Sequence, residues 1–365
     1  MKALLERAIE FYLLFWARVV MRRRRPIVVG ITGSVGKTTT KEVIAGTLMH
    51  PALTPRVGSV WKSTGNMNNT RGVPLSILGY RAWPASRRQL AAWLCAIPFR
   101  ALALAVSAAY PRVFVIEFAA GPRGDISRTA AAARPTIAVV TAIGPAHLEH
   151  FGTIERVMHE KGALVRQVPA RGLVVLGADN GNACALERDA RAPVVKVPGR
   201  GRALAEEAAR TVCGFFGVPS AAAEQAIAEQ PPVPGRLDIL EVGDIVLIDD
   251  AYNANPLSMR LGLDTLAERG AGASRRVAIL GDMKELGTAS PQYHDEIGRY
   301  ARHRADVVIG VGEAARAYEP DRWFATSREC AQAVDRLVRP GDCVLVKASN
   351  SVGLDVVAAQ LKRLG

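Results

Sequence analysis

The sequence predicts an α/β protein of two domains, each built around a largely parallel sheet. The chain has 365 residues, which is more than one hydrophobic core usually organises. Short β-branched runs alternate with longer segments, the pattern of crossover connections between parallel strands. A proline-rich stretch, PPVPGR at 231–236, separates two sets of these runs. Because prolines stiffen an exposed segment, we expect an interdomain hinge there.

The expected strands lie on either side of this hinge. The first set is PIVVGITG (26–33), VFVIEF (113–118), TIAVVTAIG (136–144) and LVVLGAD (173–179). The second set is DIVLIDD (244–250), RRVAILGD (275–282), ADVVIGVG (305–312) and DCVLVKAS (342–349). Runs that are apolar almost throughout are typical of strands covered by helices on both faces. We therefore expect a central domain over 26–230, a smaller one over 231–365, and a helix over 1–25.

Composition limits the classes of partner. The chain is 49% hydrophobic and 22% charged, which excludes a disordered protein. Lys and Arg exceed Asp and Glu by 47 to 34, so phosphates, nucleic acid or an acidic membrane are the expected partners. No basic stripe interleaved with aromatics is present, and we expect no nucleic-acid binding. The five scattered cysteines lack C-x-x-C spacing, which favours a reducing cytoplasm over a disulfide framework.

Two segments combine apolar and basic residues. Residues 2–21 have a helical pattern with aromatics and precede four arginines at 22–25, and a second such segment spans about 79–112. Arg18 and Arg100 interrupt the apolar runs, so we expect neither segment to span a membrane, and arginines at 22–25 argue against a cleavable signal. Packing on the protein and docking on an anionic membrane surface both fit the pattern, and both remain open.

The strongest local motif is GITGSVGKTTTKE at 30–42, between an expected strand and an expected helix. Glycines let backbone N–H groups surround phosphate oxygens, a lysine reaches the outer phosphates, and a threonine hydroxyl binds Mg²⁺. The motif predicts a variant P-loop that binds ATP or GTP, in a P-loop ATPase domain with a parallel-rich sheet. The predicted nucleotide-binding residues are Gly33, Ser34, Val35, Gly36, Lys37, Thr38 and Thr39.

A phosphate loop needs a carboxylate nearby for its metal. Glu117 ends one expected strand, and His147 follows another, at the edge where parallel sheets carry their ligand sites. Each is weak alone, since a strand-end acid or a lone histidine is often structural. Together they predict one crevice beside the phosphate loop.

Six motifs in order resemble the Mur ligase family, the ATP-dependent amide-forming ligases of bacterial cell-wall synthesis, and within it the branch that adds D-alanyl-D-alanine. They are TGSVGKTTTKE (32–42), TGNMNNTRGVPLSIL (64–78), EFAAGPRGDI (117–126), HLEHFGTIERVMHEK (147–161), DDAYNANPLSM (249–259) and LGDMKELG (280–287). The resemblance implies a Rossmann-like C-terminal α/β domain behind the P-loop domain. It also implies that the γ-phosphate of ATP activates a substrate carboxylate as an acyl phosphate, which an amine then attacks.

The resemblance also implies roles for individual residues. Lys37 and Thr38 would hold phosphate and metal, Glu117 and His147 would ligate Mg²⁺, and Lys161, carbamylated by CO₂, would be an acidic metal-orienting group. The alternative for Lys161 is an ordinary solvated helical lysine, which keeps a pKa near 10 and cannot ligate a metal.

Further residues match the family with less distinctive motifs. The implied adenine and nucleotide contacts are Asn253, Asn255 and Arg236, with Tyr252, Asp249, Asp250 and Lys284 as weaker candidates. The implied substrate contacts are Asn66, Asn68 and Asn69. For the Asn-Pro pair at 255–256, a turn or a helix start is the structural alternative, and for His294 it is a packing or surface position.

The sequence also departs from the family. The phosphate loop starts at Gly30, where the family first has a UDP-sugar-binding domain, so we expect no room for that domain. KASN at 347–350 replaces the family's K-G-S-R, and 79–112 matches no family segment.

The expected partners are a carboxylate-bearing cell-wall precursor or polymer and an amino acid or dipeptide. We expect a cytoplasmic enzyme, with attachment to the inner face of the membrane left open. The alternative is a catalytically reduced, nucleotide-binding scaffold.

Overall fold

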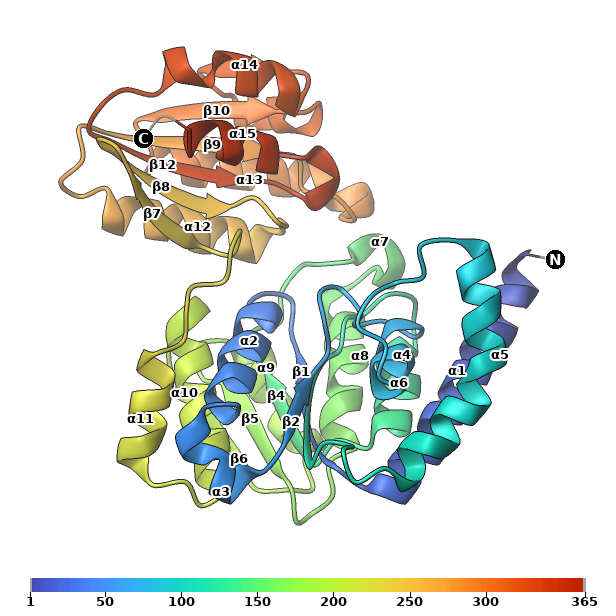
Figure 1. Ribbon diagram of the computed structural model, residues 1–365. Helices are drawn as coiled ribbons and strands as arrows, with labels where there is room; N and C mark the ends of the chain where they lie inside the picture. Colours follow the sequence, from blue (N-terminus) through green and yellow to red (C-terminus); the bar gives the residue numbers. More distant parts are fainter. Residues whose placement is uncertain (1, 364–365) are drawn as a thin grey trace. The chain divides into compact units, whose positions relative to one another are not determined.

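The computed structural model describes residues 2–363. The chain forms two compact units (Figure 1). The first unit comprises Met1–Ile143 and Glu155–Gln230, and the second comprises Gly144–Ile154 and Pro231–Gly365. The short segment Gly144–Ile154 thus interrupts the first unit in sequence but belongs to the second by its contacts. Each unit is described by itself.

The sheet of the first unit is parallel, with strand order β2-β3-β1-β4-β5-β6 among the described residues. Its strands are β1 (Ile27–Thr32), β2 (Val60–Lys62), β3 (Val113–Glu117), β4 (Ile137–Val140), β5 (Leu173–Gly177) and β6 (Val194–Val197). The four expected strands form, and β2 and β6 add short strands that the sequence analysis did not identify. Strands β1, β3, β4 and β5 are buried almost throughout, which explains their continuous apolar runs.

Helices cover both faces of this sheet. One core lies between the sheet and helices α2, α10 and α11, where Val29, Val115 and Val139 meet Ile44 and Val212. Figure 1 shows α4, α6 and α8 on the other side. The helices of this unit are α1 (Lys2–Arg24), α2 (Lys37–Leu48), α3 (Thr54–Val57), α4 (Gly72–Ile77), α5 (Arg87–Val106), α6 (Asp125–Ala133), α8 (Ile154–Arg166), α9 (Gly181–Cys184), α10 (Gly201–Phe215) and α11 (Ser220–Ala228).

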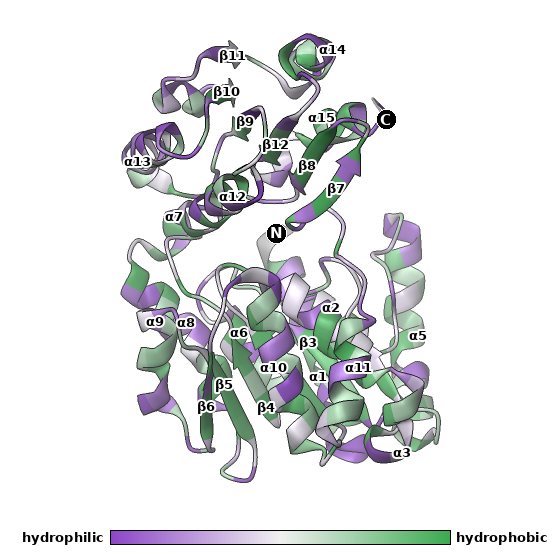
Figure 2. Cartoon of the chain, turned by 90° about the vertical axis from the view of Figure 1, so that its left-hand side faces the viewer, coloured by the Kyte–Doolittle hydropathy of each residue, from purple (hydrophilic) through white to green (hydrophobic). Residues whose placement is uncertain are grey.

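Helices α1 and α5 pack together at the side of the first unit (Figure 1). The Tyr12 hydroxyl donates to the Leu94 carbonyl at 2.8 Å. By length and composition alone α5 is apolar enough to cross a membrane, although Arg100 interrupts its apolar run. Figure 2 shows hydrophobic residues along much of this helix. The Arg100 guanidinium donates to the carbonyls of Leu78 and Gly79, so its charge is turned toward the protein.

The second unit has a mixed sheet, with strand order β11-β10-β9-β12-β8-β7. Its strands are β7 (Asp238–Val242), β8 (Ile245–Asp250), β9 (Arg275–Gly281), β10 (Val307–Val311), β11 (Arg322–Phe324) and β12 (Asp342–Lys347). Strand β7 runs antiparallel to β8, and the other described pairs are parallel. The helices are α7 (Leu148–Phe151), α12 (Pro256–Arg269), α13 (Ser290–Arg302), α14 (Ser327–Leu337) and α15 (Asp355–Leu361).

Candidate active site

The phosphate loop connects the end of β1 to the start of α2. Gly33 has φ 151° and Gly36 has φ 83°, a region of backbone conformation that favours glycine. A Cβ at Gly33 would lie 2.0 Å from the Thr141 hydroxyl oxygen, so a larger residue cannot fit there. Gly36 is the N-cap of α2, whose first N–H groups and partial positive charge therefore face the loop. This geometry can hold phosphate oxygens.

Lys37 lies over this loop. Its Nζ atom donates to the Gly33 carbonyl at 2.9 Å and lies 3.5 Å from the Ser34 carbonyl oxygen. The Ser34 N–H in turn donates to Ala142, at the end of β4, at 2.6 Å. The neighbouring strand thus supports the loop that the lysine covers. A phosphate bound in the loop would meet the positive charge of this amine.

Glu117 reaches the loop because β3 is the parallel neighbour of β1. Register pairs Ile31 with Glu117, so the carboxylate emerges where the loop begins. The Thr38 hydroxyl donates to one oxygen of Glu117 at 3.0 Å, and the Asn68 amide donates to the other at 2.9 Å. Glu117 is buried, with 2% of its surface exposed. The sequence analysis selected all three residues, and the structure brings them together.

The donor set at this point fits a magnesium ion. A hydroxyl and a carboxylate oxygen are hard ligands of the type Mg²⁺ prefers. Among residues 2–363, no three His, Cys, Asp or Glu side chains cluster as a metal site. Mg²⁺ is usually held by one or two carboxylates together with phosphate oxygens and water. Ligation by Thr38 and Glu117 stays a prediction.

Lys161 lies beneath the phosphate loop. It is fully buried on α8, and its Nζ atom donates to the Gly33 carbonyl at 2.8 Å. Burial lowers the pKa of this amine well below its usual value, the charge of Lys37 lowers it further, and Glu160 and Glu117 oppose the shift. The alternative of a solvated helical lysine is therefore wrong. A lowered pKa favours the neutral amine, which is the form that reacts with CO₂, but carbamylation itself stays a prediction.

Glu160 was missed by the sequence analysis, although it precedes Lys161 in the same motif. Its two carboxylate oxygens accept from the N–H groups of Gly124 and Ile126 at 2.7 and 2.8 Å. These groups lie at the start of α6, where a negative charge is stabilised. Glu160 thus joins α8 to the segment that follows β3, and this contact helps to position Lys161.

His147 belongs to the second unit, unlike Glu117. It precedes α7 with φ 56°, and its Nδ1 atom pairs with the Glu285 carboxylate. The Glu149 N–H also donates to the Glu285 carbonyl at 3.1 Å. Both contacts attach this segment to the loop after β9. The predicted crevice formed by His147 and Glu117 stays a prediction.

In the motif DDAYNANP of the second unit, the polar residues Asp249, Asp250 and Asn255 are buried, whereas Tyr252 and Asn253 are exposed. Lys347 donates to an Asp250 carboxylate oxygen at 2.5 Å and to the Asn253 carbonyl at 2.8 Å. The Asn255 side chain accepts from the Ser258 N–H at 2.9 Å and caps α12, as the structural alternative predicted. An adenine contact by Asn253 or Asn255 stays a prediction.

The weaker candidates of this unit also have protein contacts. The Arg236 guanidinium lies 3.7 Å from the centre of the Tyr252 ring, a cation–π contact. Asp249 pairs with Lys362 at 2.7 Å, and Lys284 pairs with Asp282 at 2.8 Å. A nucleotide contact by any of these residues stays a prediction.

His294 is a packing residue of the second unit. It is fully buried, accepts from the Met283 N–H at 2.9 Å and lies 2.7 Å from the Ser290 carbonyl oxygen. Burial lowers the pKa of this imidazole, so it is neutral at pH 7. Its ring stacks on Tyr318. The histidine thus holds the segment LGDMKELG on α13.

The predicted substrate segment also touches both apolar-basic segments. The Trp83 indole donates to the Asn66 side-chain oxygen at 2.9 Å, and the Thr70 hydroxyl donates to Glu10 of α1 at 2.9 Å. Asn69 accepts from the Gly72 N–H at 2.9 Å and shapes the start of α4. No sequence signal linked Glu10 or Trp83 to this segment, because both contacts join residues distant in the chain.

Two family models and curated proteins of known name match this chain. Residues 96–219 match the Mur ligase middle domain, and residues 235–350 match the Mur ligase, glutamate ligase domain. The chain is 32% identical to UDP-N-acetylmuramoyl-tripeptide–D-alanyl-D-alanine ligase of Mycobacterium tuberculosis, over 92% of this chain and 72% of that protein. It is 28% identical to the ligase of the same name from Escherichia coli, over 96% of this chain and 79% of that protein.

Solved structures agree on the fold. MurF ligase from Thermotoga maritima in complex with ADP aligns with a TM-score of 0.77 and 24% identity, over 97% of this chain and 84% of that one. A bifunctional folylpolyglutamate synthase/dihydrofolate synthase from Yersinia pestis, complexed with AMPPNP and Mn, aligns with a TM-score of 0.64 and 17% identity, over 95% and 93%. The identity over nearly the whole chain and the shared architecture establish that this chain belongs to the Mur ligase family of ATP-dependent acid–amino acid ligases.

Proposed function

We propose that the chain joins the free carboxylate of a UDP-N-acetylmuramoyl-tripeptide to the amine of D-alanyl-D-alanine, with conversion of ATP to ADP and phosphate. The observation that carries this proposal is the cluster of Lys37, Thr38, Glu117 and Lys161 around the phosphate loop. The names of its curated relatives supply the substrate pair. The reaction takes place in the cytoplasm, where ATP is available.

The chemistry proceeds in two steps. A carboxylate oxygen attacks the γ-phosphorus of ATP, and the bond from this phosphorus to the β-γ bridging oxygen breaks. ADP departs, and the substrate now carries an acyl phosphate. The dipeptide amine then attacks the acyl carbon, the C–O bond to phosphate breaks, and the amine loses a proton as the amide forms. Lys37 and the N-terminus of α2 stabilise the charge that shifts onto phosphate oxygens. When bound, Mg²⁺ neutralises further phosphate charge, and Thr38 and Glu117 would hold it.

We also propose that Lys161 acts as its carbamate. The neutral amine attacks CO₂, an N–C bond forms, and one proton goes to solvent. Burial, which lowers the pKa of this amine, favours the neutral form that reacts. The product is a carboxylate-like group beneath the loop, near Lys37 and the predicted metal ligands. ¹³C NMR on protein equilibrated with ¹³CO₂ should show a carbamate signal in the wild type and none from this site in Lys161→Ala. The absence of the signal in the wild type would contradict the proposal.

The substrate carboxylate would approach through the segment that carries Asn66, Asn68 and Asn69. Asn68 already bonds to Glu117, so this segment borders the predicted metal site. We also propose that His147, Asn253, Asn255 and Arg236 contact the nucleotide.

The exposed sides of α1 and α5 suggest attachment to an anionic membrane. Phe11 and Phe15 of α1 are 69% and 48% exposed, and Phe99 and Val106 of α5 are 76% and 74% exposed. Burying such large apolar side chains in a bilayer is favourable, and the net charge of +13 favours an anionic one. We propose a peripheral contact. Flotation with phosphatidylglycerol vesicles should capture the wild type and release a Phe11→Ser/Phe99→Ser variant.

A phosphate-release assay tests the proposed ligase activity. Purified protein with ATP, Mg²⁺, UDP-N-acetylmuramoyl-tripeptide and D-alanyl-D-alanine should release phosphate and form the amide, detected by mass spectrometry. Leaving out either substrate should abolish amide formation. Lys196→Ala is the matched control for Lys161→Ala, since Lys196 pairs with Glu187 on the protein surface. ATP binding without phosphate release, given both substrates, would favour the alternative of a nucleotide-binding scaffold.

A further inference from the structure

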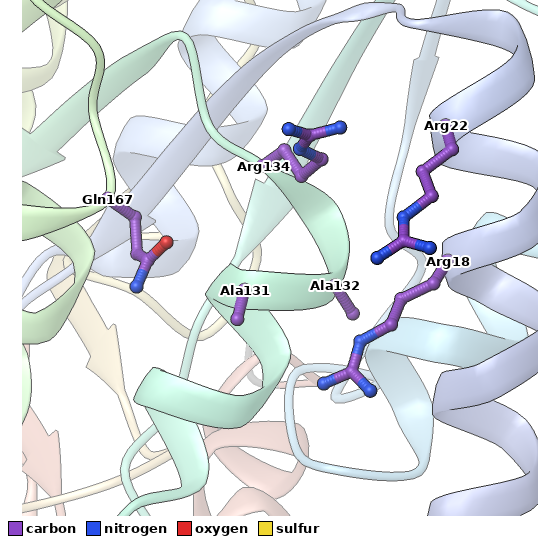
Figure 3. A pocket seen from close by; sticks show the side chains of 6 residues that line it. All are labelled: Arg18, Arg22, Ala131, Ala132, Arg134 and Gln167. Carbon is purple, nitrogen blue, oxygen red and sulfur yellow. The ribbon is translucent and has the colours of Figure 1, made fainter.

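A basic cavity lies between α1, the end of α6 and the end of α8. It measures about 310 Å³, and its lining includes Arg18 and Arg22 of α1, Arg134 and Gln167. Figure 3 shows Arg18 and Arg22 extending from α1 toward α6, with Arg134 at the end of α6. Two separated parts of the chain, α1 and the end of α6, thus place three guanidinium groups around one cavity.

The positive charge of this cavity is not balanced by the protein. Among the described residues, Arg18, Arg22 and Arg134 have no carboxylate within 4.0 Å, although other arginines of the unit do, such as Arg166 with Asp189 at 2.6 Å. The carbonyls at the end of α6 are the other available acceptors, but in the described part of the chain neither Arg18 nor Arg22 donates to them. Like charges gathered in this way repel, so an anion would be stabilised here.

The ligand chemistry follows from the side chains. A guanidinium group presents planar paired donors that match phosphate oxygens, and arginines are the usual residues where phosphate geometry is recognised. The Gln167 amide adds a neutral donor at the same cavity.

This cavity is distinct from the phosphate loop. Arg22 precedes β1, Arg134 precedes β4 and Gln167 precedes β5, so the cavity lies at the edge of the sheet where these parallel strands begin. The phosphate loop follows the other end of β1. A strand of six residues spans about 20 Å, too far for one nucleotide phosphate to serve both sites.

One face of α1 carries aromatic residues first and arginines further along the helix. Phe11, Phe15, Arg18 and Arg22 are spaced by four, three and four residues, which places them along one side of a helix. The exposed aromatics therefore lead directly to the arginines of the cavity. An apolar stretch beside a phosphate-binding cavity is the arrangement expected for a phospholipid, whose headgroup and chains are adjacent.

We propose that the cavity formed by Arg18, Arg22 and Arg134 binds a phosphate group that is separate from ATP. The group belongs to a phosphate ester or diphosphate, carried either by a membrane lipid or by a soluble compound. Binding requires neither the ligase reaction nor the phosphate loop, so it can be tested on protein that has no turnover.

The test uses the full chain with Lys37→Ala, which weakens binding at the phosphate loop. In that background Arg18→Gln/Arg134→Gln removes two guanidinium groups and leaves polar, uncharged side chains. Arg23→Gln is the matched control, because Arg23 is exposed on the same helix and does not line the cavity. Thermal unfolding without ligand checks that every variant is folded. The first arm titrates inorganic pyrophosphate by calorimetry, and the second measures flotation with phosphatidylglycerol vesicles.

We expect the cavity variant to bind at least about tenfold more weakly than the Arg23→Gln control, because it lacks two charge-assisted contacts to the phosphate group. A loss confined to pyrophosphate identifies a soluble phosphate compound as the ligand, and a loss confined to vesicles identifies a lipid headgroup. Equal behaviour of the cavity variant and the control in both arms overturns the proposal. Failure of the phosphate-release assay leaves this result unaffected, so the two proposals fail separately.

Discussion

Lys161 in the first unit and Lys347 in the second are both buried, and the two lysines differ in what surrounds them. Lys347, in the second unit, pairs with the Asp250 carboxylate at 2.5 Å. Lys161, in the first unit, donates to the Gly33 carbonyl and faces Lys37, while Glu117 and Glu160 are occupied by other donors. A paired buried charge is part of a structure, whereas an unpaired buried amine costs stability and is poised to react. The comparison separates a structural lysine from a chemical one.

The largest expected effect is on turnover through Lys161. Lys161→Met should lower kcat by at least about 10³-fold, because it removes the carbamate and the positioned charge beneath the phosphate loop. Phosphate release under saturating ATP is the measurement. Lys196→Met, a surface change of the same kind, should stay within about twofold of wild type. A Lys161→Met enzyme with more than a tenth of wild-type turnover would remove the distinction between the two lysines.

Lys347→Met should instead destabilise the second unit. It leaves the Asp250 carboxylate buried without its partner, which costs about 3–5 kcal/mol. Urea unfolding followed by fluorescence measures the loss. Changing both residues, Lys347→Met with Asp250→Leu, should recover part of the stability, because no uncompensated charge remains. Equal stability of the single variant and wild type would show that Lys347 is not structural.

The pH dependence of stability distinguishes Lys161 in a second way. Its pKa in the folded protein is lowered below the ordinary 10.5, so the unfolded chain binds more protons as pH falls below that value. Lys161 therefore lowers stability at neutral pH, and this cost disappears as pH rises toward 10.5. In bicarbonate-free buffer Lys161→Met should melt above wild type at pH 7. The difference should shrink by pH 10, and a difference that grows with pH would contradict the assignment.

The smallest effect is expected at Glu160. Glu160→Gln keeps one acceptor but loses one of the two bonds to the Gly124 and Ile126 N–H groups, which costs about 1 kcal/mol. It also removes a negative charge that raises the pKa of Lys161. Thermal unfolding should therefore show a small loss for this variant, and none for Glu187→Gln on the surface. A loss as large as that of Lys347→Met would indicate a larger structural role for Glu160.

Local chemistry made much of the first unit predictable. Apolar runs with β-branched residues indicated strands, and the glycine spacing at 30–37 indicated the turn that β1 makes into α2. Glu117 could be placed beside the loop because parallel strands end at one edge of a sheet. Short strands such as β2 and β6 were missed, because three or four residues carry too little periodicity to be recognised.

The sequence by itself determined the family, most of the parallel strands and the residues of the phosphate loop, because these depend on neighbours along the chain. Only the tertiary structure decided that Lys161 is buried, that His147 belongs to the second unit, and that Arg18 and Arg134 line the same cavity. Burial and unbalanced charge are properties of residues brought together from distant segments, and the spacing of residues within one segment does not encode them.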